Sequence, residues 1–395
     1  MPGSYYTGIE KGGNVMKKLI RFASIACASA MLFSTTAFAE GETFKIGSIG
    51  PMTGAAATYG NAVMNAIQLA VDEVNEAGGV NGAMLEFNPQ DDENDAEKSV
   101  NAYNTLKDWG MQMLLGTVTS APCIAVGAEA ANDNMFLLTP SGSAVECIAA
   151  GDNAFRVCFS DPDQGTASAK YIGENKLAEK VAVIYDSSDV YSAGIYATFQ
   201  AEAANQPFEI VAAEAFTADS KTDFSVQLQK AKDAGADLVY MPIYYNEASL
   251  ILTQADAMGF APKWFGVDGM DGILTVEGFD TALAEGLMLL TPFSADAQDD
   301  LTKNFVTKYE ELYGEEPIQF AADAYDGVYI IKAALEKAGA TPDMDASALC
   351  DALKAAMTEI TVDGLTGAGM TWDETREPSK EPKAVVIQDG VYVGM

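Results

Sequence analysis

Histidine is absent from the 395 residues, and this absence narrows the chemistry open to the chain. Histidine is the most frequent general base and metal ligand, and it activates the nucleophile of many hydrolases. A hydrolytic or zinc-dependent enzyme is therefore not expected. Basic residues are also scarce, because 23 Lys and Arg stand against 57 Asp and Glu, giving a formal net charge of −34. Such an acidic surface repels phosphate groups, which argues against nucleic acid and anionic lipids as partners.

Motifs of nucleotide, metal and serine-hydrolase chemistry are missing as well. The segments GSIGP (47–51) and TPSGS (139–143) match neither the two glycine-rich nucleotide motifs nor the G-x-S-x-G nucleophile turn. The acidic run DDENDAE (91–97) lacks the spacing of a calcium loop, so a solvated acidic loop is the favoured interpretation. We expect no cofactor and no metal, and an exported enzyme is the least favoured function.

An export signal is predicted near the start of the chain. Residues 16–39 open with three basic residues, continue with an apolar stretch at 22–33 and end in Ala-Phe-Ala. The apolar stretch is too short and too rich in serine for stable membrane insertion. We therefore predict a leader over 1–39 that is cleaved after Ala39, with Met16 as the true start, and a mature protein that is periplasmic or extracellular.

Few cysteines remain after this cleavage: Cys123, Cys147, Cys158 and Cys350. Four cysteines in an exported chain permit three full pairings, and spacing alone cannot choose among them. Cys123 with Cys147 is the candidate disulfide, and four free thiols are the alternative.

The mature chain alternates short apolar runs with amphipathic stretches, which is typical of parallel sheets covered by helices. Such a chain is too long for one domain, and the rhythm occurs twice, over 44–155 and 165–290. The fold class is therefore α/β with two doubly wound parallel-sheet lobes, and segments 155–161 and 287–294 are suited to cross between them. Strands are expected at 44–50, 84–89, 111–118, 135–140, 181–185, 208–216, 236–243 and 263–267.

The run at 48–82, SIGPMTGAAATYGNAVMNAIQLAVDEVNEAGGVNG, followed by DDENDAEKS at 91–99, resembles the leucine/isoleucine/valine-binding family of solute receptors. The resemblance continues in order along nearly the whole mature chain. It implies the type I periplasmic binding protein fold, with three hinge crossings and a ligand in the cleft. The lobe boundaries that we expect are 43–157 plus 294–368 for lobe 1 and 158–293 plus 369–395 for lobe 2. The resemblance also implies a monomer that serves the permease of an ABC transporter.

Polar residues stand at the carboxyl ends of the expected strands, where open α/β sheets bind ligands. Ser120 precedes a helix, so its hydroxyl either caps that helix or, with the following N–H groups, binds an anion such as a carboxylate. Ser141 and Ser143 add a carbonyl and a hydroxyl, with a polar turn as the alternative. Asp268 ends the strand at 263–267, and its carboxylate would pair with an α-ammonium group. The family usually carries the longer Glu at this position.

The resemblance implies further contact positions, which are aromatic or lie beside those already named. An isolated tyrosine more often packs against the core, but convergence on one cleft favours ligand binding. These further positions are Tyr59, Val118, Gly142, Tyr191, Tyr244 and Phe320.

Together these groups complement both ends of a zwitterion, and no Lys or Arg stands among them to bind an acidic side chain. We therefore predict an extracytoplasmic receptor that captures a small uncharged amino acid, branched-chain or aliphatic, by hinge closure. The alternative is a receptor of the same fold for an amide, urea or an aromatic acid.

Overall fold

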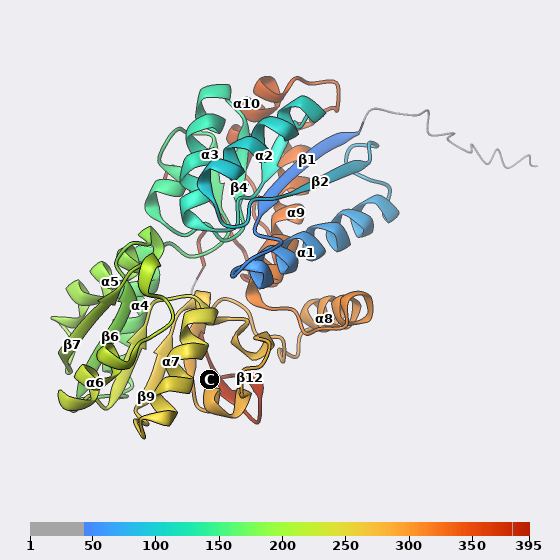
Figure 1. The fold of residues 1–395 in the computed structure, drawn as a ribbon. Helices are drawn as coiled ribbons and strands as arrows, with labels where there is room; N and C mark the ends of the chain where they lie inside the picture. The colour runs from blue at the N-terminus through green and yellow to red at the C-terminus, as the bar shows by residue number, and fades with distance from the viewer. Residues whose placement is uncertain (1–42, 381) are drawn as a thin grey trace, which may run out of the picture. The chain divides into compact units, whose positions relative to one another are not determined.

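The chain folds into two β-sheets, each flanked by helices, in a computed structural model that describes residues 43–380 and 382–395 (Figure 1). The predicted leader lies outside the described residues. The strands are β1 (Phe44–Gly50), β2 (Leu85–Asp91), β3 (Met113–Leu115), β4 (Phe136–Thr139), β5 (Ala154–Arg156), β6 (Lys180–Asp186), β7 (Glu209–Phe216), β8 (Leu238–Met241), β9 (Lys263–Gly266), β10 (Met288–Thr291), β11 (Lys383–Gln388) and β12 (Val391–Gly394). The α-helices are α1 (Ala57–Glu76), α2 (Ala96–Trp109), α3 (Ser120–Asp133), α4 (Asp161–Glu174), α5 (Val190–Ala203), α6 (Ser225–Asp233), α7 (Tyr245–Ala257), α8 (Asp300–Tyr313), α9 (Gln319–Ala338) and α10 (Ala346–Met357).

The first sheet is parallel throughout, in the order β2-β1-β3-β4-β5. Its central strands are hydrophobic on both faces because helices cover both. In β3, Met113 and Leu115 pack into the core under α1 and α9, whereas Leu114 between them packs with α2 and α3. Side chains alternate between the faces of a strand, and burying each one contributes about 1.5–3 kcal/mol. A strand that is apolar at every position can therefore be buried on both of its faces.

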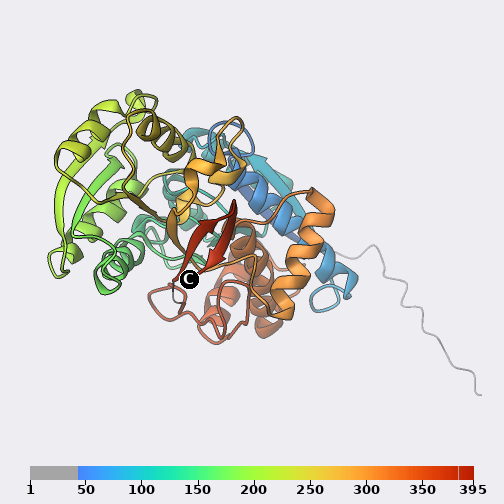
Figure 2. The same cartoon turned by 90° about the horizontal axis from the view of Figure 1, so that it is seen from below.

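The second sheet has seven strands in the order β12-β11-β10-β9-β8-β6-β7, and the same alternation builds its two cores. Val181 and Val183 of β6 pack with α4 and α5, and Ala182 and Ile184 pack on the opposite face. The strands from β6 to β10 are parallel, but β11 runs antiparallel to β10 and pairs with β12 as a hairpin (Figure 2).

Helices α8, α9 and α10 follow β10 but pack with the first sheet. Asn81 donates to the carbonyl oxygen of Leu335 at 3.0 Å, and the Tyr313 hydroxyl donates to that of Asn65 at 2.8 Å. The chain therefore passes between the two sheets three times: after β5, after β10 and before β11. The first passage falls in the expected crossing segment 155–161, whereas most of the other expected segment, 287–294, is strand β10 itself and the chain crosses after it. The exact lobe boundaries stay a prediction.

The predicted fold class is confirmed.

The acidic run at 91–97 contains a turn whose carboxylates accept hydrogen bonds from backbone N–H groups. Asp91 accepts from the backbone N–H of Met52 at 2.8 Å, and Asp95 caps α2 by accepting from that of Lys98 at 2.9 Å. Within residues 43–380 and 382–395, no three His, Cys, Asp or Glu side chains gather in a way that could hold a metal ion.

The candidate disulfide between Cys123 and Cys147 is wrong for this structure, where all four described cysteines are buried free thiols. Each of the two sulfur atoms instead lies near a backbone carbonyl oxygen: Cys123 Sγ is 3.9 Å from that of Cys147, and Cys147 Sγ is 3.7 Å from that of Ser120. None of the helices in the described ranges is both long enough and apolar enough to cross a membrane.

Candidate functional site

The carboxyl ends of strands from both sheets meet at a cavity of about 240 Å³. The space enclosed by these strand ends is small, so the cavity suits a small molecule. Nine of the ten predicted site residues line it: Tyr59, Val118, Ser120, Ser141, Ser143, Tyr191, Tyr244, Asp268 and Phe320. None of its lining residues is a lysine or an arginine.

One end of the cavity is formed by the start of α3 and the loop after β4. The predicted cap is off by one residue: Thr119 occupies the N-cap position, and Ser120 is the first helical residue. The Ser120 hydroxyl accepts from the backbone N–H of Ala144 at 3.2 Å, whereas the buried Ser143 hydroxyl forms no hydrogen bond of ordinary geometry within the described part of the chain, although the Asp161 carboxyl lies near it. A helix N-terminus carries partial positive charge, so this end of the cavity suits a carboxylate.

A buried arginine fixes the backbone of that loop. Arg156 is fully buried, and its guanidinium donates to the carbonyl oxygen of Ala144 at 2.9 Å and to that of Ser143. Its Nε lies 2.9 Å from Oε2 of Glu377, in the segment that leads to β11. Since its charge is matched there and its donors are directed at carbonyl groups, Arg156 orients the loop without entering the cavity.

The second sheet contributes the single charged residue among the lining side chains, Asp268. Tyr191 donates from its hydroxyl to Oδ1 of Asp268 at 2.6 Å, and Gln164 donates from Nε2 to Oδ2 at 2.9 Å. Burial raises the pKa of this carboxyl from 3.8 to about 6, although the bonds from Tyr191, Gln164 and the N–H of Gly269 act against the rise. At neutral pH the cavity therefore holds a carboxylate whose charge no lining residue neutralises.

Aromatic rings form further walls of the cavity. The ring of Tyr59 stacks on Phe320 with centroids 4.3 Å apart, and Tyr244 stacks on Tyr191 at 5.0 Å. The Tyr59 hydroxyl donates to the carbonyl oxygen of Gly269 and accepts from the N–H of Tyr245 at 3.3 Å. Because Tyr59 lies on α1, whereas Tyr245 begins α7 and Gly269 follows β9 of the second sheet, these bonds hold the cavity closed.

Gly142, the tenth predicted residue, does not line the cavity. A Cβ atom at this position would lie 2.8 Å from Oγ1 of Thr139 and 2.9 Å from Sγ of Cys123, so glycine permits the tight turn behind the cavity wall. Sequence reasoning missed two lining residues, Thr119 and Gly269. Each is next in sequence to a predicted residue, and this adjacency is the one signal that would have found them.

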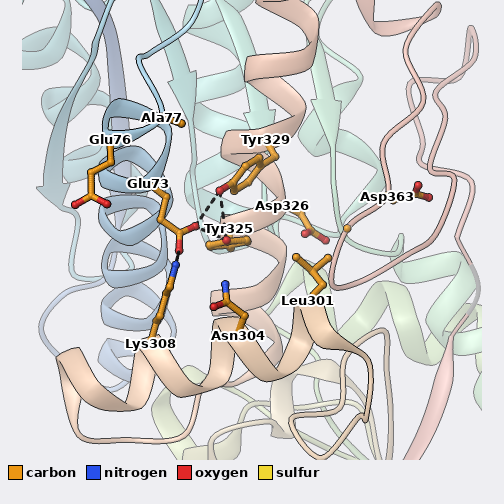
Figure 3. Close-up of a pocket in the computed structure, with 11 residues that line it drawn as sticks. Glu73, Glu76, Ala77, Leu301, Asn304, Lys308, Tyr325, Asp326, Tyr329 and Asp363 are labelled. Carbon is orange, nitrogen blue, oxygen red and sulfur yellow. Dashed lines mark hydrogen bonds and ion pairs between the residues drawn. The ribbon is translucent and has the colours of Figure 1, made fainter.

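A larger cavity of about 1010 Å³, partly open to solvent, lies between α1, α8 and α9 (Figure 3). Several of its polar groups already have partners: Glu73 pairs with Lys308 and accepts from the hydroxyls of Tyr325 and Tyr329. Asp326 accepts from two backbone N–H groups of the 365–366 turn. The smaller cavity, with the Ser143 hydroxyl and an unneutralised carboxylate, is therefore the better candidate for a ligand site.

These features define a receptor that encloses a small ligand between two α/β units, and comparison with known proteins agrees. The periplasmic binding protein family matches residues 43–390, so the chain belongs to this family. A leucine-, isoleucine-, valine-, threonine- and alanine-binding protein of Pseudomonas aeruginosa is 29% identical over 343 residues, which cover 86% of this chain and 89% of the relative. Leu/Ile/Val-binding protein homolog 3 of Brucella melitensis is 30% identical over 333 residues, which cover 82% and 87%.

Solved structures show the same likeness. The branched-chain amino acid transporter substrate binding protein LivJ of Streptococcus pneumoniae, in complex with isoleucine, has a TM-score of 0.80 at 29% identity, over 90% of this chain and 100% of that one. The leucine binding protein LivK of Thermotoga maritima has a TM-score of 0.79 at 27% identity, over 89% and 98%. The predicted resemblance is confirmed, and the chain is a binding protein and not an enzyme.

Proposed function

We propose that this chain is the extracytoplasmic receptor of an ABC importer and that it captures a small uncharged amino acid, branched-chain or aliphatic, by closure of its two lobes. One observation carries the proposal: Asp268, from the second sheet, lines the same aromatic-walled cavity as the α3 N-terminus and the Ser143 hydroxyl from the first sheet. An α-ammonium would pair with Asp268, and the α-carboxylate would accept hydrogen bonds from the α3 N-terminus and a serine hydroxyl.

The names of the relatives support the same ligand class, since the Pseudomonas protein is named for five uncharged amino acids and the Streptococcus structure holds isoleucine. An aromatic acid or an amide has no ammonium group, so it would leave the buried carboxylate of Asp268 unpaired. The proposal therefore favours an amino acid over these alternatives.

Calorimetric titration at pH 7.5 with each of the twenty amino acids, benzoate and acetamide tests the proposal. We expect saturable one-to-one binding of leucine, isoleucine or valine and none of lysine or glutamate. A charged side chain would lose hydration in a cavity that offers it no partner. Binding of no amino acid, or tightest binding of a charged one, would contradict the proposal.

Export and delivery belong to the same proposal. The family name places related receptors in the periplasm, and residues 16–39 have the pattern of a signal peptide. We propose cleavage after Ala39, a monomeric mature protein and docking of its closed form on a permease. The intact mass of the protein purified from its native envelope, with Glu40 expected as the first residue, tests the cleavage site.

The Tyr59→Phe variant is expected to bind the selected amino acid about 5–10-fold more weakly. It loses the hydroxyl that bonds Gly269 and Tyr245 across the closed cavity, while its ring still stacks on Phe320. Calorimetry measures the change, and Tyr103→Phe is the matched control. Tyr103 is equally buried but bonds Asp133, away from the cavity. Equal affinity of the two variants would show that these bonds do not support closure.

A further inference from the structure

Gln164 is a buried residue that contacts the cavity's carboxylate without lining the cavity itself. It lies in the first turn of α4 and is 3% exposed. Its Nε2 donates to Oδ2 of Asp268 at 2.9 Å, and its Oε1 accepts from the backbone N–H of the same residue at 3.3 Å. One amide thus holds both the side chain and the backbone of Asp268, although the two residues are 104 positions apart.

We infer that Gln164 is the positioning residue of the ammonium-binding carboxylate, which it holds ionised and turned toward the ligand. The inference rests on the proposed function of Asp268. Asp268 has one rotatable bond fewer than glutamate and is already held by Tyr191 through Oδ1, so the bond to Oδ2 completes the definition of its plane. A donor to the ionised form also opposes the effect of burial on that form.

The surroundings of Asp268 show which other groups act on its charge. The titratable groups facing it are the phenols of Tyr59 (α1), Tyr191 (α5), Tyr240 (β8) and Tyr244 (N-cap of α7), the thiol of Cys158, and the carboxyls of Asp161 (α4) and Asp323 (α9). Burial raises the pKa of each phenol further above its ordinary value of 10.0, so the phenols stay neutral from pH 5 to 9. Among residues 43–380 and 382–395, Gln164 is the one amide side chain that donates to Asp268.

Two variants remove this donor with little change of volume. Gln164→Met keeps the length of the side chain, and Gln164→Glu keeps its shape but places a second carboxyl beside Asp268. The matched control is Gln112→Met, because Gln112 is also buried and makes three hydrogen bonds, but to Lys45, Pro342 and Met344.

Carbon-13 NMR of the aspartate carboxyls in the ligand-free protein gives the titration midpoint of Asp268, assigned with Asp268→Asn and Asp161→Asn. We expect Gln164→Met to raise this midpoint by about one pH unit and Gln164→Glu to raise it further. Leucine affinity, measured by calorimetry from pH 5 to 9, should then fall about tenfold more at pH 5.5 than at pH 9 in Gln164→Met relative to wild type. Gln112→Met should lower the thermal midpoint and move neither profile.

An unchanged Asp268 midpoint in Gln164→Met would overturn the inference and leave Gln164 with a structural role. The titration needs no ligand, so it decides the inference even if wild-type protein binds no amino acid. Failure of the wild-type protein to bind any amino acid would count against the proposed function alone. If Gln164→Met does not fold, Gln164→Leu removes the same donor without adding a charge and supplies the same measurement.

Discussion

The Asp268→Asn variant is expected to bind its amino acid at least about 100-fold more weakly than wild type while unfolding at a higher temperature at pH 7. Binding falls because the ammonium group loses its buried counter-ion. Stability rises because burial lifts the pKa of Asp268 from 3.8 to about 6, so holding the ionised carboxylate in the folded protein is unfavourable at neutral pH. Asparagine removes that charge, for a net gain on the order of 1 kcal/mol.

The direction of the pKa shift of Asp268 determines the pH range in which its charge destabilises the folded protein. The folded pKa lies above the unfolded one, so the destabilisation is fully present above about pH 6 and disappears as the pH falls below 3.8. The gain in thermal midpoint should therefore vanish near pH 4, and wild-type affinity should itself decline below about pH 6. Asp326→Asn is the control, since Asp326 is equally buried but bonds Leu365 and Thr366. Retained affinity in Asp268→Asn would remove its proposed role.

The Lys380→Met variant is expected to lose about 3–5 kcal/mol of unfolding free energy. The Lys380 ammonium lies 2.8 Å from Oδ1 of Asp323 and 2.8 Å from the Thr366 hydroxyl, and both charged side chains are fully buried. Methionine fills the space but leaves Asp323 without a counter-ion. Urea denaturation followed by circular dichroism measures the loss, which should shrink as the pH falls and Asp323 takes up a proton.

The comparison for this variant is Lys337→Met, whose partner Glu359 lies at the surface. An exposed pair contributes about 0–1 kcal/mol, so its loss should hardly be measurable. Replacing both buried partners, as Lys380→Met with Asp323→Leu, should recover part of the stability. Similar losses for Lys380→Met and Lys337→Met would show that the buried pair does not tie α9 to the segment before β11.

Most of the fold and of the cavity lining was predictable because both depend mainly on short-range sequence patterns. Strands such as 44–50 are short apolar runs between turn signals, and β1 has these same bounds. Ser120, Ser143 and Asp268 were predictable because each follows the end of a strand, and the ends of parallel strands meet at one edge of a sheet. Helix starts are less certain by a residue or two, which is why Thr119 and not Ser120 occupies the N-cap.

What could not be predicted depends on contacts between distant segments. Nothing near Gln164 in sequence indicates that its amide reaches Asp268, and Arg156 meets Glu377 only after the chain has passed to the second sheet and returned. The sequence around Lys380 does not indicate that this side chain is buried. Its charge can be buried only because Asp323, from a distant segment, lies beside it. Such pairs depend on the packing of the folded chain, and the spacing of apolar residues in the sequence does not predict them.

The hairpin β11–β12 has a consequence for how the protein acquires its structure. It completes a sheet whose other strands lie between residues 180 and 291, yet it is translated roughly 90 residues after β10, its antiparallel neighbour. Until residues 383–394 leave the ribosome, the backbone edge of β10 has no partner on that side, and exposed strand edges attract chaperones or other chains. The second sheet is therefore completed only at the end of synthesis, and slow translation of the intervening helices would prolong the time during which the edge of β10 is exposed.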